Sequence, residues 1–142
     1  MKKKGLIVAI DGPAGSGKST VTHFLAQKLK YTHIDTGALY RGIALKTIEA
    51  KGSLDDVVAL GKTAEKSKLE FKWTADGKNL LFVDGQDVSG RIRTPEVSMA
   101  ASKISAYDEV RQALLGLQRR LGVQGAVVIE GREIGKVVFP NA

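Results

Sequence analysis

Residues 5–20 constrain this chain more than any other stretch, because an apolar run there leads into a glycine-rich loop and a helix start. Residues 6–10 are all apolar, which is typical of a strand buried on both faces of a parallel sheet. The pattern Gly-x-x-x-x-Gly-Lys-Ser, a complete phosphate-binding P-loop, begins at Gly12. Its glycines turn backbone N–H groups toward a phosphate, and the following helix offers its positive N-terminal end. The sequence therefore predicts a nucleotide-phosphate site between a strand and a helix.

Two side chains of the motif carry its chemistry. Lys18 is expected to reach the β- and γ-phosphates, and the Ser19 hydroxyl is expected to ligate Mg²⁺. The alternative is a plain glycine turn that joins a strand to a helix. Apolar residues recur at helical spacing over residues 21–29, so the loop opens a helix that faces a core. This context favours the phosphate-binding interpretation.

The composition limits the classes of protein to which the chain can belong. With 142 residues, 43% of them hydrophobic, it is long enough for one domain with its own core. It has no cysteine, which excludes disulfides and thiolate metal sites and suits a reducing compartment. No apolar run is as long as a membrane span, and the lysines at positions 2–4 precede no signal-peptide core. We expect a single domain, residues 1–142, that is cytoplasmic and has no membrane partner.

The net charge of +7, from 22 basic and 15 acidic residues, raises the question of a nucleic-acid partner. The basic residues are scattered, and no basic patch interleaved with aromatic residues occurs. A basic balance also suits a pocket that holds two polyphosphate-bearing molecules. We therefore expect no nucleic-acid partner.

The next segments add polar residues at the same edge of the expected sheet. Residues 31–35 are typical of a short strand that ends at Asp35 and is followed by Thr36. Because the carboxyl ends of parallel strands face the ligand crevice, we expect both residues to lie beside the P-loop. A helix is expected over residues 38–51 with Arg41 in its first turns, where a cation opposes the helix dipole. That position hints at an anionic ligand, although a plain surface arginine fits equally well.

The middle of the chain changes from helical to period-two patterning. Apolar and charged residues alternate over residues 69–73, and Asp-Gly turns follow at residues 76–77 and 84–85. This pattern predicts an antiparallel meander, inserted at about residues 62–93 into a parallel α/β domain. We expect Trp73 and the phenylalanines to form the small core of the meander rather than a platform for stacked bases.

Capping patterns mark three further helices, which begin at Ser53 with Asp56, at Thr94 with Pro95, and at Ser105 with Asp108. The apolar run at residues 126–129 predicts another inner strand, which delivers Glu-Gly-Arg-Glu at residues 130–133. Carboxylates around an arginine can be a surface cluster, but their place beside the phosphate crevice favours a site. His23 and His33 are expected to pack or to lie on the surface rather than to catalyse.

Together these motifs resemble bacterial cytidylate kinase, also called CMP kinase. Besides the P-loop, the resemblance rests on Asp-Thr-Gly-Ala-Leu-Tyr-Arg at 35–41, Asp-Val-Ser-Gly at 87–90, Ile-Arg-Thr at 92–94, Ala-Ala-Ser at 100–102, Val-Arg at 110–111, Glu-Gly-Arg-Glu-Ile-Gly at 130–135 and Val-Val-Phe-Pro at 137–140. These segments span nearly the whole chain in the right order, and the later ones separate this family from other P-loop kinases. The resemblance implies an α/β P-loop nucleoside monophosphate kinase fold, in which helices flank a parallel sheet that carries an antiparallel insert.

The resemblance also implies the activity, which is transfer of a phosphoryl group from ATP to CMP or dCMP, with Mg²⁺. ATP would be held by Gly12, Pro13, Ala14, Gly15, Ser16, Gly17, Lys18, Ser19 and Thr20. The acceptor would be held by Thr36 and Arg41 at its phosphate and ribose, Ser102 and Arg111 at cytosine, and Arg132 at the phosphate that is attacked. Glu133 would help to hold the base, since a carboxylate accepts from the cytosine 4-amino group that uracil lacks. Ser19 and Glu130 would ligate Mg²⁺, and Lys18, Arg41 and Arg132 would be the catalytic residues.

The sequence departs from the family in three ways. Glu130 and Glu133 replace more usual aspartates, which moves each charge about one methylene farther, and Lys136 replaces a usual threonine. Family members continue past residues 139–140 into further strands and an arginine-bearing lid, so the P-loop strand here would keep an unpaired edge. We therefore expect a fragment, or the visible part of a longer chain that is a monomer when complete. Alone, it would bind phosphate but catalyse poorly.

The implied mechanism needs no general base. The phosphate of CMP has its second pKa at about 6, so at neutral pH it is largely a nucleophilic dianion. Catalysis would then consist of positioning and of charge neutralisation by Mg²⁺ and the three catalytic cations. Three alternatives remain open: a P-loop kinase for another nucleoside monophosphate, a nucleotide-binding fragment without catalysis, and a GTPase switch. The last is disfavoured because no Asn-Lys-x-Asp motif occurs.

Overall fold

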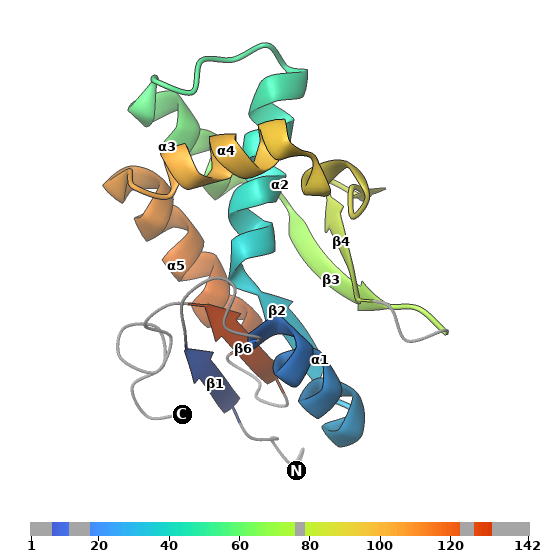
Figure 1. Cartoon of the computed structure of the whole chain (residues 1–142). Coiled ribbons are helices and arrows are strands. Elements are labelled where there is room, and N and C mark those ends of the chain that lie inside the picture. The colour runs from blue at the N-terminus through green and yellow to red at the C-terminus, as the bar shows by residue number, and fades with distance from the viewer. Residues whose placement is uncertain (1–6, 12–17, 76–78, 123–126, 132–142) are drawn as a thin grey trace. The chain divides into compact units, whose positions relative to one another are not determined.

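The computed structural model describes residues 7–11, 18–75, 79–122 and 127–131 (Figure 1). The chain forms two compact units. One comprises residues 1–36, 73–79 and 118–142, and the other comprises residues 37–72 and 80–117. No helix in the described ranges is long and apolar enough to cross a membrane.

The first unit contains a parallel sheet in the strand order β1-β6-β2. Its strands are β1 (Ile7–Asp11), β2 (Thr32–Asp35) and β6 (Val127–Gly131), and helix α1 (Lys18–Leu29) packs against all three (Figure 1). The register places Glu130 opposite both Ile10 and Asp35. The three predicted parallel strands are therefore confirmed, and β1 lies at an edge of the described sheet.

Buried apolar side chains explain why these segments form strands. Val127, Val128 and Ile129 of β6 are almost fully buried, as is Ile34 of β2, and Ala26 of α1 packs into the same interior. Consecutive residues of a strand point to opposite faces, so the burial of these three β6 residues shows that both faces of this strand are covered, which matches its continuous apolar run.

Trp73 does not occupy the position that the sequence predicted. Its ring lies 5.2 Å from that of His23 and 6.3 Å from that of His33, and its Nε1 donates to the Tyr31 carbonyl at 3.1 Å. Asn79 Nδ2 likewise donates to the His33 carbonyl at 2.9 Å. The assignment of Trp73 to the core of the meander is therefore wrong, because this side chain packs near His23 and His33 and hydrogen-bonds to the backbone of Tyr31, which precedes β2.

Most of the remaining elements belong to the second unit. They are α2 (Thr36–Glu49), α3 (Val57–Lys66), β3 (Leu69–Trp73), β4 (Asn79–Val83), β5 (Gln86–Asp87), the 3₁₀ turn at Arg91–Arg93, α4 (Pro95–Ile104) and α5 (Asp108–Gly122). The second sheet has the order β3-β4-β5, with β4 antiparallel to β5. This confirms the inserted meander, whereas the turn expected at residues 76–77 lies outside the described residues.

Helix starts follow side-chain caps, although not always the expected one. Thr94 Oγ1 accepts from the Val97 N–H at 3.3 Å, so the predicted start of α4 is confirmed. For α3 the cap is Asp56, whose carboxylate accepts from the Ala59 N–H at 3.1 Å, and Ser53 instead accepts from the Asp55 N–H. The helix therefore begins three residues later than a Ser53 cap would place it.

The core of the second unit gathers apolar residues from α2, α3, α4, α5 and the meander. Its largest fully buried members are Leu39, Ile43, Leu60, Leu81, Ile104 and Leu114. Gly42 lets α2 approach the meander closely, because a Cβ there would lie 3.2–3.3 Å from the side chains of Leu69, Leu81 and Val83.

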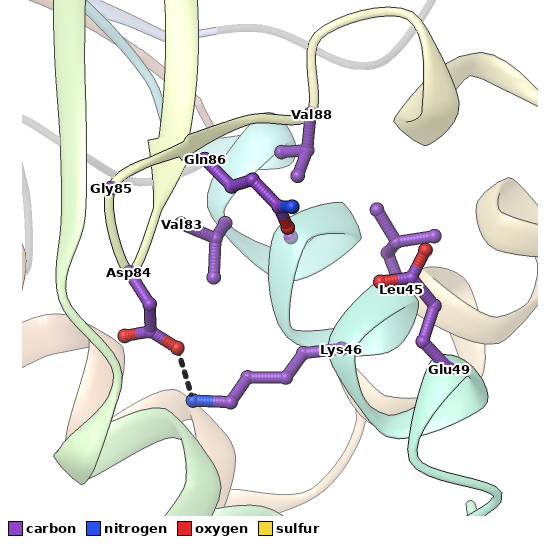
Figure 2. Close-up of a pocket in the computed structure, with 9 residues that line it drawn as sticks. Leu45, Lys46, Glu49, Val83, Asp84, Gly85, Gln86 and Val88 are labelled. Carbon is purple, nitrogen blue, oxygen red and sulfur yellow. Dashed lines mark hydrogen bonds and ion pairs between the residues drawn. The ribbon is translucent and has the colours of Figure 1, made fainter.

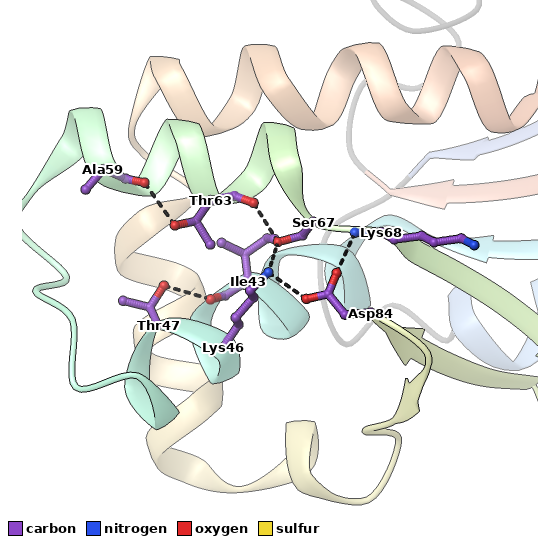
Figure 3. A network of polar contacts seen from close by, with 8 residues as sticks. All are labelled: Ile43, Lys46, Thr47, Ala59, Thr63, Ser67, Lys68 and Asp84. Carbon is purple, nitrogen blue, oxygen red and sulfur yellow. Dashed lines mark hydrogen bonds and ion pairs between the residues drawn. The ribbon is translucent and has the colours of Figure 1, made fainter.

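A polar network joins α2 to residues 68 and 84, which lie side by side just before β3 and just after β4 (Figure 3). Asp84 Oδ2 accepts from Lys46 Nζ at 2.6 Å, and Oδ1 accepts from the Lys68 N–H at 2.9 Å. Asp84 and Gly85 both have positive φ, 51° and 83°, as a tight Asp-Gly hairpin turn requires. The Lys46 hydrogen bond, followed by that from the Lys68 backbone, holds the pKa of the Asp84 carboxyl below its ordinary value.

We predict that Asp84→Asn lowers the free energy of unfolding at pH 7 by less than about 1 kcal/mol, because the ion pair is solvent-exposed. Asparagine keeps the size of the side chain and tolerates positive φ, so the change isolates the charge. Since the folded pKa is depressed, the carboxylate stabilises the fold above the unfolded pKa of about 3.9. The difference between the two proteins should therefore vanish as pH falls through the folded pKa, as measured by urea unfolding.

The matched control is Glu65→Gln, which removes one exposed carboxylate of α3 and changes the net charge equally. It should not alter the pH dependence of stability. Identical pH profiles for Asp84→Asn and Glu65→Gln would contradict the assignment.

Candidate functional site

The P-loop sequence lies between a strand and a helix. β1 ends at Asp11 and α1 begins at Lys18, while residues 12–17 lie outside the described part. The register places Asp11 opposite Gly131, and Asp35 opposite Glu130. The carboxyl ends of the three strands therefore lie at the same end of the sheet, and the P-loop sequence follows directly after one of them.

Glu130 is the centre of the described polar contacts at this edge. Its side chain is 1% exposed, and its Oε1 lies 2.9 Å from Nε2 of the buried His33. Its backbone carbonyl accepts from Thr36 Oγ1 at 2.8 Å. A buried carboxylate is costly without hydrogen-bond partners, and these contacts fix the end of β6 against His33 and Thr36.

The hydrogen bond of Thr36 limits what this side chain can do for a ligand. A hydroxyl has one proton, and that of Thr36 is directed to the Glu130 carbonyl. Its oxygen keeps the capacity to accept. Thr36 can therefore accept from a ligand hydroxyl, but cannot also donate to a phosphate oxygen.

In the second unit, Tyr40 is a partly buried tyrosine related to two of the predicted acceptor residues. Arg41 is half-buried and follows Tyr40 on α2. Burial raises the pKa of the Tyr40 phenol above its ordinary value, and the positive charge of Arg111 on α5 partly opposes that rise. Tyr40 and Arg111 are therefore electrostatic neighbours, and the Tyr40 hydroxyl stays protonated at neutral pH.

For the other predicted site residues the structure gives a position in an element or no description. Ser102 is exposed on α4, and its carbonyl accepts from Ser105 Oγ at 2.8 Å. The ATP residues Lys18, Ser19 and Thr20 form the first turn of α1. The residues outside the described part are Gly12, Pro13, Ala14, Gly15, Ser16, Gly17, Arg132 and Glu133.

Sequence reasoning did not single out His33 or Tyr40 as site residues. His33 is joined to Glu130 across 97 residues of sequence, so no local pattern indicates their contact. Its one signal is the strand period: His33 lies two residues before Asp35 and therefore shares its face of the sheet.

An open cavity of about 270 Å³ lies in the second unit between α2 and the β4–β5 turn (Figure 2). Its charged residues are already paired, because Lys46 contacts Asp84 and Glu49 contacts Arg91. None of the predicted site residues lines it. We therefore do not assign the candidate site to this cavity.

Comparisons with known proteins agree on one family. The family model described as Cytidylate kinase matches residues 8–142. The Cytidylate kinase of Syntrophotalea carbinolica is 50% identical over 137 residues, which are 96% of this chain and 58% of that protein. Those of Citrifermentans bemidjiense and Pasteurella multocida are 47% and 42% identical, and cover 100% and 96% of this chain. The chain spans about 60% of the length of these relatives.

We predict that Thr36→Val lowers the free energy of unfolding by about 1 kcal/mol, because it removes the hydrogen bond to Glu130 without changing the shape of the side chain. Thr47→Val is the matched control on the same helix. Its hydroxyl donates to the Ile43 carbonyl at 2.9 Å, four residues back, and that carbonyl is already an acceptor in the helix. Urea unfolding should show a smaller loss for Thr47→Val, and equal losses would contradict the prediction.

Proposed function

Because this chain belongs to the cytidylate kinase family, we propose that the protein transfers a phosphoryl group from ATP to CMP or dCMP, giving ADP and CDP or dCDP. The observation that carries the proposal is the placement of the glycine motif, with β1 ending before it and α1 beginning at Lys18. A P-loop needs this strand–loop–helix context. The ends of β2 and β6 lie at the same edge, which supports an acceptor beside the triphosphate.

In the proposed reaction the acceptor phosphate is the nucleophile. It is largely a dianion at neutral pH, since its second pKa is about 6, and so it needs no general base. The main barrier is the approach of two polyanions. We propose that Lys18, Arg41 and Arg132 lower this barrier, because they would neutralise the phosphates and align them.

Mg²⁺ fits the chemistry of the residues at this edge. It prefers oxygen ligands, usually one or two carboxylates together with substrate phosphates and water. Ser19 and Glu130 supply a hydroxyl and a carboxylate, the latter with Oε1 fixed by His33. When bound, the ion would supply charge neutralisation at the phosphates. We propose that Ser19 and Glu130 hold it.

We propose that the acceptor residues divide the nucleotide between them. Thr36, whose proton is already donated to Glu130, would accept from a ribose hydroxyl, and Arg41 and Arg132 would bind the phosphate. Ser102, Arg111 and Glu133 would bind the cytosine, with Glu133 accepting from its 4-amino group.

We further propose that the protein acts in the cytoplasm as a monomer and binds no nucleic acid. The scattered basic residues support the absence of a nucleic-acid partner. Size-exclusion chromatography with light scattering would test the monomer, and a filter-binding assay with RNA and DNA would test the second point.

The acceptor is tested by ADP release, measured in a coupled assay with CMP, dCMP, UMP and AMP. CMP and dCMP should exceed UMP in kcat/KM by at least about 10²-fold, because uracil lacks the amino donor that Glu133 would bind. AMP should be poorer still. Comparable turnover of UMP or AMP would indicate a kinase for another nucleoside monophosphate.

We predict that Arg41→Ala lowers kcat/KM for CMP by at least about 10²-fold, because it removes a cation from the phosphate that must approach ATP. Arg120→Ala is the control, since it removes the same charge from the exposed end of α5. The control should keep nearly full activity in the same assay. A loss common to both variants would point to net charge rather than to a specific phosphate contact.

A further inference from the structure

The buried pair of His33 and Glu130 is not explained by the phosphate chemistry assigned so far. His33 is opposite Val128 in the parallel register, two residues before Glu130 on β6. Side chains two apart share a face, so the two side chains together span the backbone rise of about 6.6 Å between their positions. The two atoms meet at 2.9 Å.

Two aromatic rings lie near the His33 ring, and one side chain forms a hydrogen bond with the His33 backbone. The His23 ring, on α1, lies 6.0 Å away, and the Trp73 ring lies 6.3 Å away. Asn79 Nδ2 binds the His33 carbonyl at 2.9 Å. Among the described residues no donor or acceptor meets His33 Nδ1, which is buried, so Glu130 is the described side-chain partner of the imidazole.

Two side chains, one from β2 and one from the start of α2, form hydrogen bonds with two different polar groups of Glu130. His33 of β2 binds its carboxylate, and Thr36 at the start of α2 binds its carbonyl. The next residues of the chain are Gly131, Arg132 and Glu133, to which the proposed function gives roles at the acceptor. The position of the end of β6 therefore depends on how Glu130 is held.

We propose that His33 is a positioning residue for phosphoryl transfer: it fixes the Glu130 carboxylate, and with it the carboxyl end of β6, without touching either nucleotide. This inference rests on the proposed function. Polar contacts behind a functional carboxylate commonly change activity by about 10- to 100-fold when they are removed. Misplacing a group by a fraction of an ångström affects the transition state more than ground-state binding.

The test compares His33→Leu with His33→Gln in the full-length protein. Glutamine keeps an N–H donor near the position of Nε2, whereas leucine keeps only apolar volume. We expect His33→Leu to lower kcat with CMP and ATP by about 10- to 100-fold, with a smaller change in either KM. His33→Gln should recover most of that loss.

Two further variants separate positioning from stability. Ile34→Val truncates the neighbouring buried residue of β2 and is the control for lost stability. When its melting temperature falls by about as much as that of His33→Leu, it should still keep the wild-type kcat. Glu130→Asp shortens the carboxylate so that it no longer reaches His33. In the double variant with His33→Leu, kcat should fall no further than in the worse single variant.

The outcomes distinguish failure of the positioning role from failure of the proposed function. If wild-type protein phosphorylates another monophosphate instead of CMP, the proposed acceptor is wrong, and the same ratios are measured with the accepted one. Equal kcat for the His33→Leu, His33→Gln and Ile34→Val variants, or additive losses in the double variant, would overturn the positioning role. A wild-type protein that phosphorylates no nucleoside monophosphate would overturn both.

Discussion

The parallel pairing of β6 with both β1 and β2 is the constraint on which the candidate site depends. It brings residues near positions 10, 35 and 130 to one edge of a sheet, although they are far apart in the chain. Side chains alternate along a strand, so a slip of one residue would turn Glu130 to the opposite face, away from His33. The register, which the buried apolar run of β6 secures, therefore also decides which polar groups meet.

Features with a local physical cause could be predicted from the sequence. The apolar runs predicted β1 and β6, and the glycine motif predicted the junction at which α1 begins. Thr94 and Pro95 predicted the start of α4, because a capping hydroxyl and a fixed proline φ act within one turn. The Asp84-Gly85 turn was also predictable, since positive φ restricts the residues that can form it.

Features that depend on distant partners could not be predicted. Ser53 and Asp56 are both good caps, and the local sequence does not show that Asp56 binds the helix N–H. The alternating pattern around Trp73 fits a strand, but its packing on His23 and His33 depends on where the meander meets β2. For His33 and Glu130 the sequence offers two polar residues 97 positions apart, and only the register joins them.

A fixed carboxylate at a phosphate site has an electrostatic rationale. The proposed reaction brings two polyanions together, so a mobile negative charge beside them would oppose binding. Glu130 contacts the His33 ring through Oε1 and is almost fully buried, which limits the movement of its carboxylate. A carboxylate held in this way can favour a cation over a phosphate, because its oxygen is placed before either ligand arrives. In the proposed mechanism the arginines and the lysine would bind phosphate, and His33, which would take no part in proton transfer, would fix the position of Glu130.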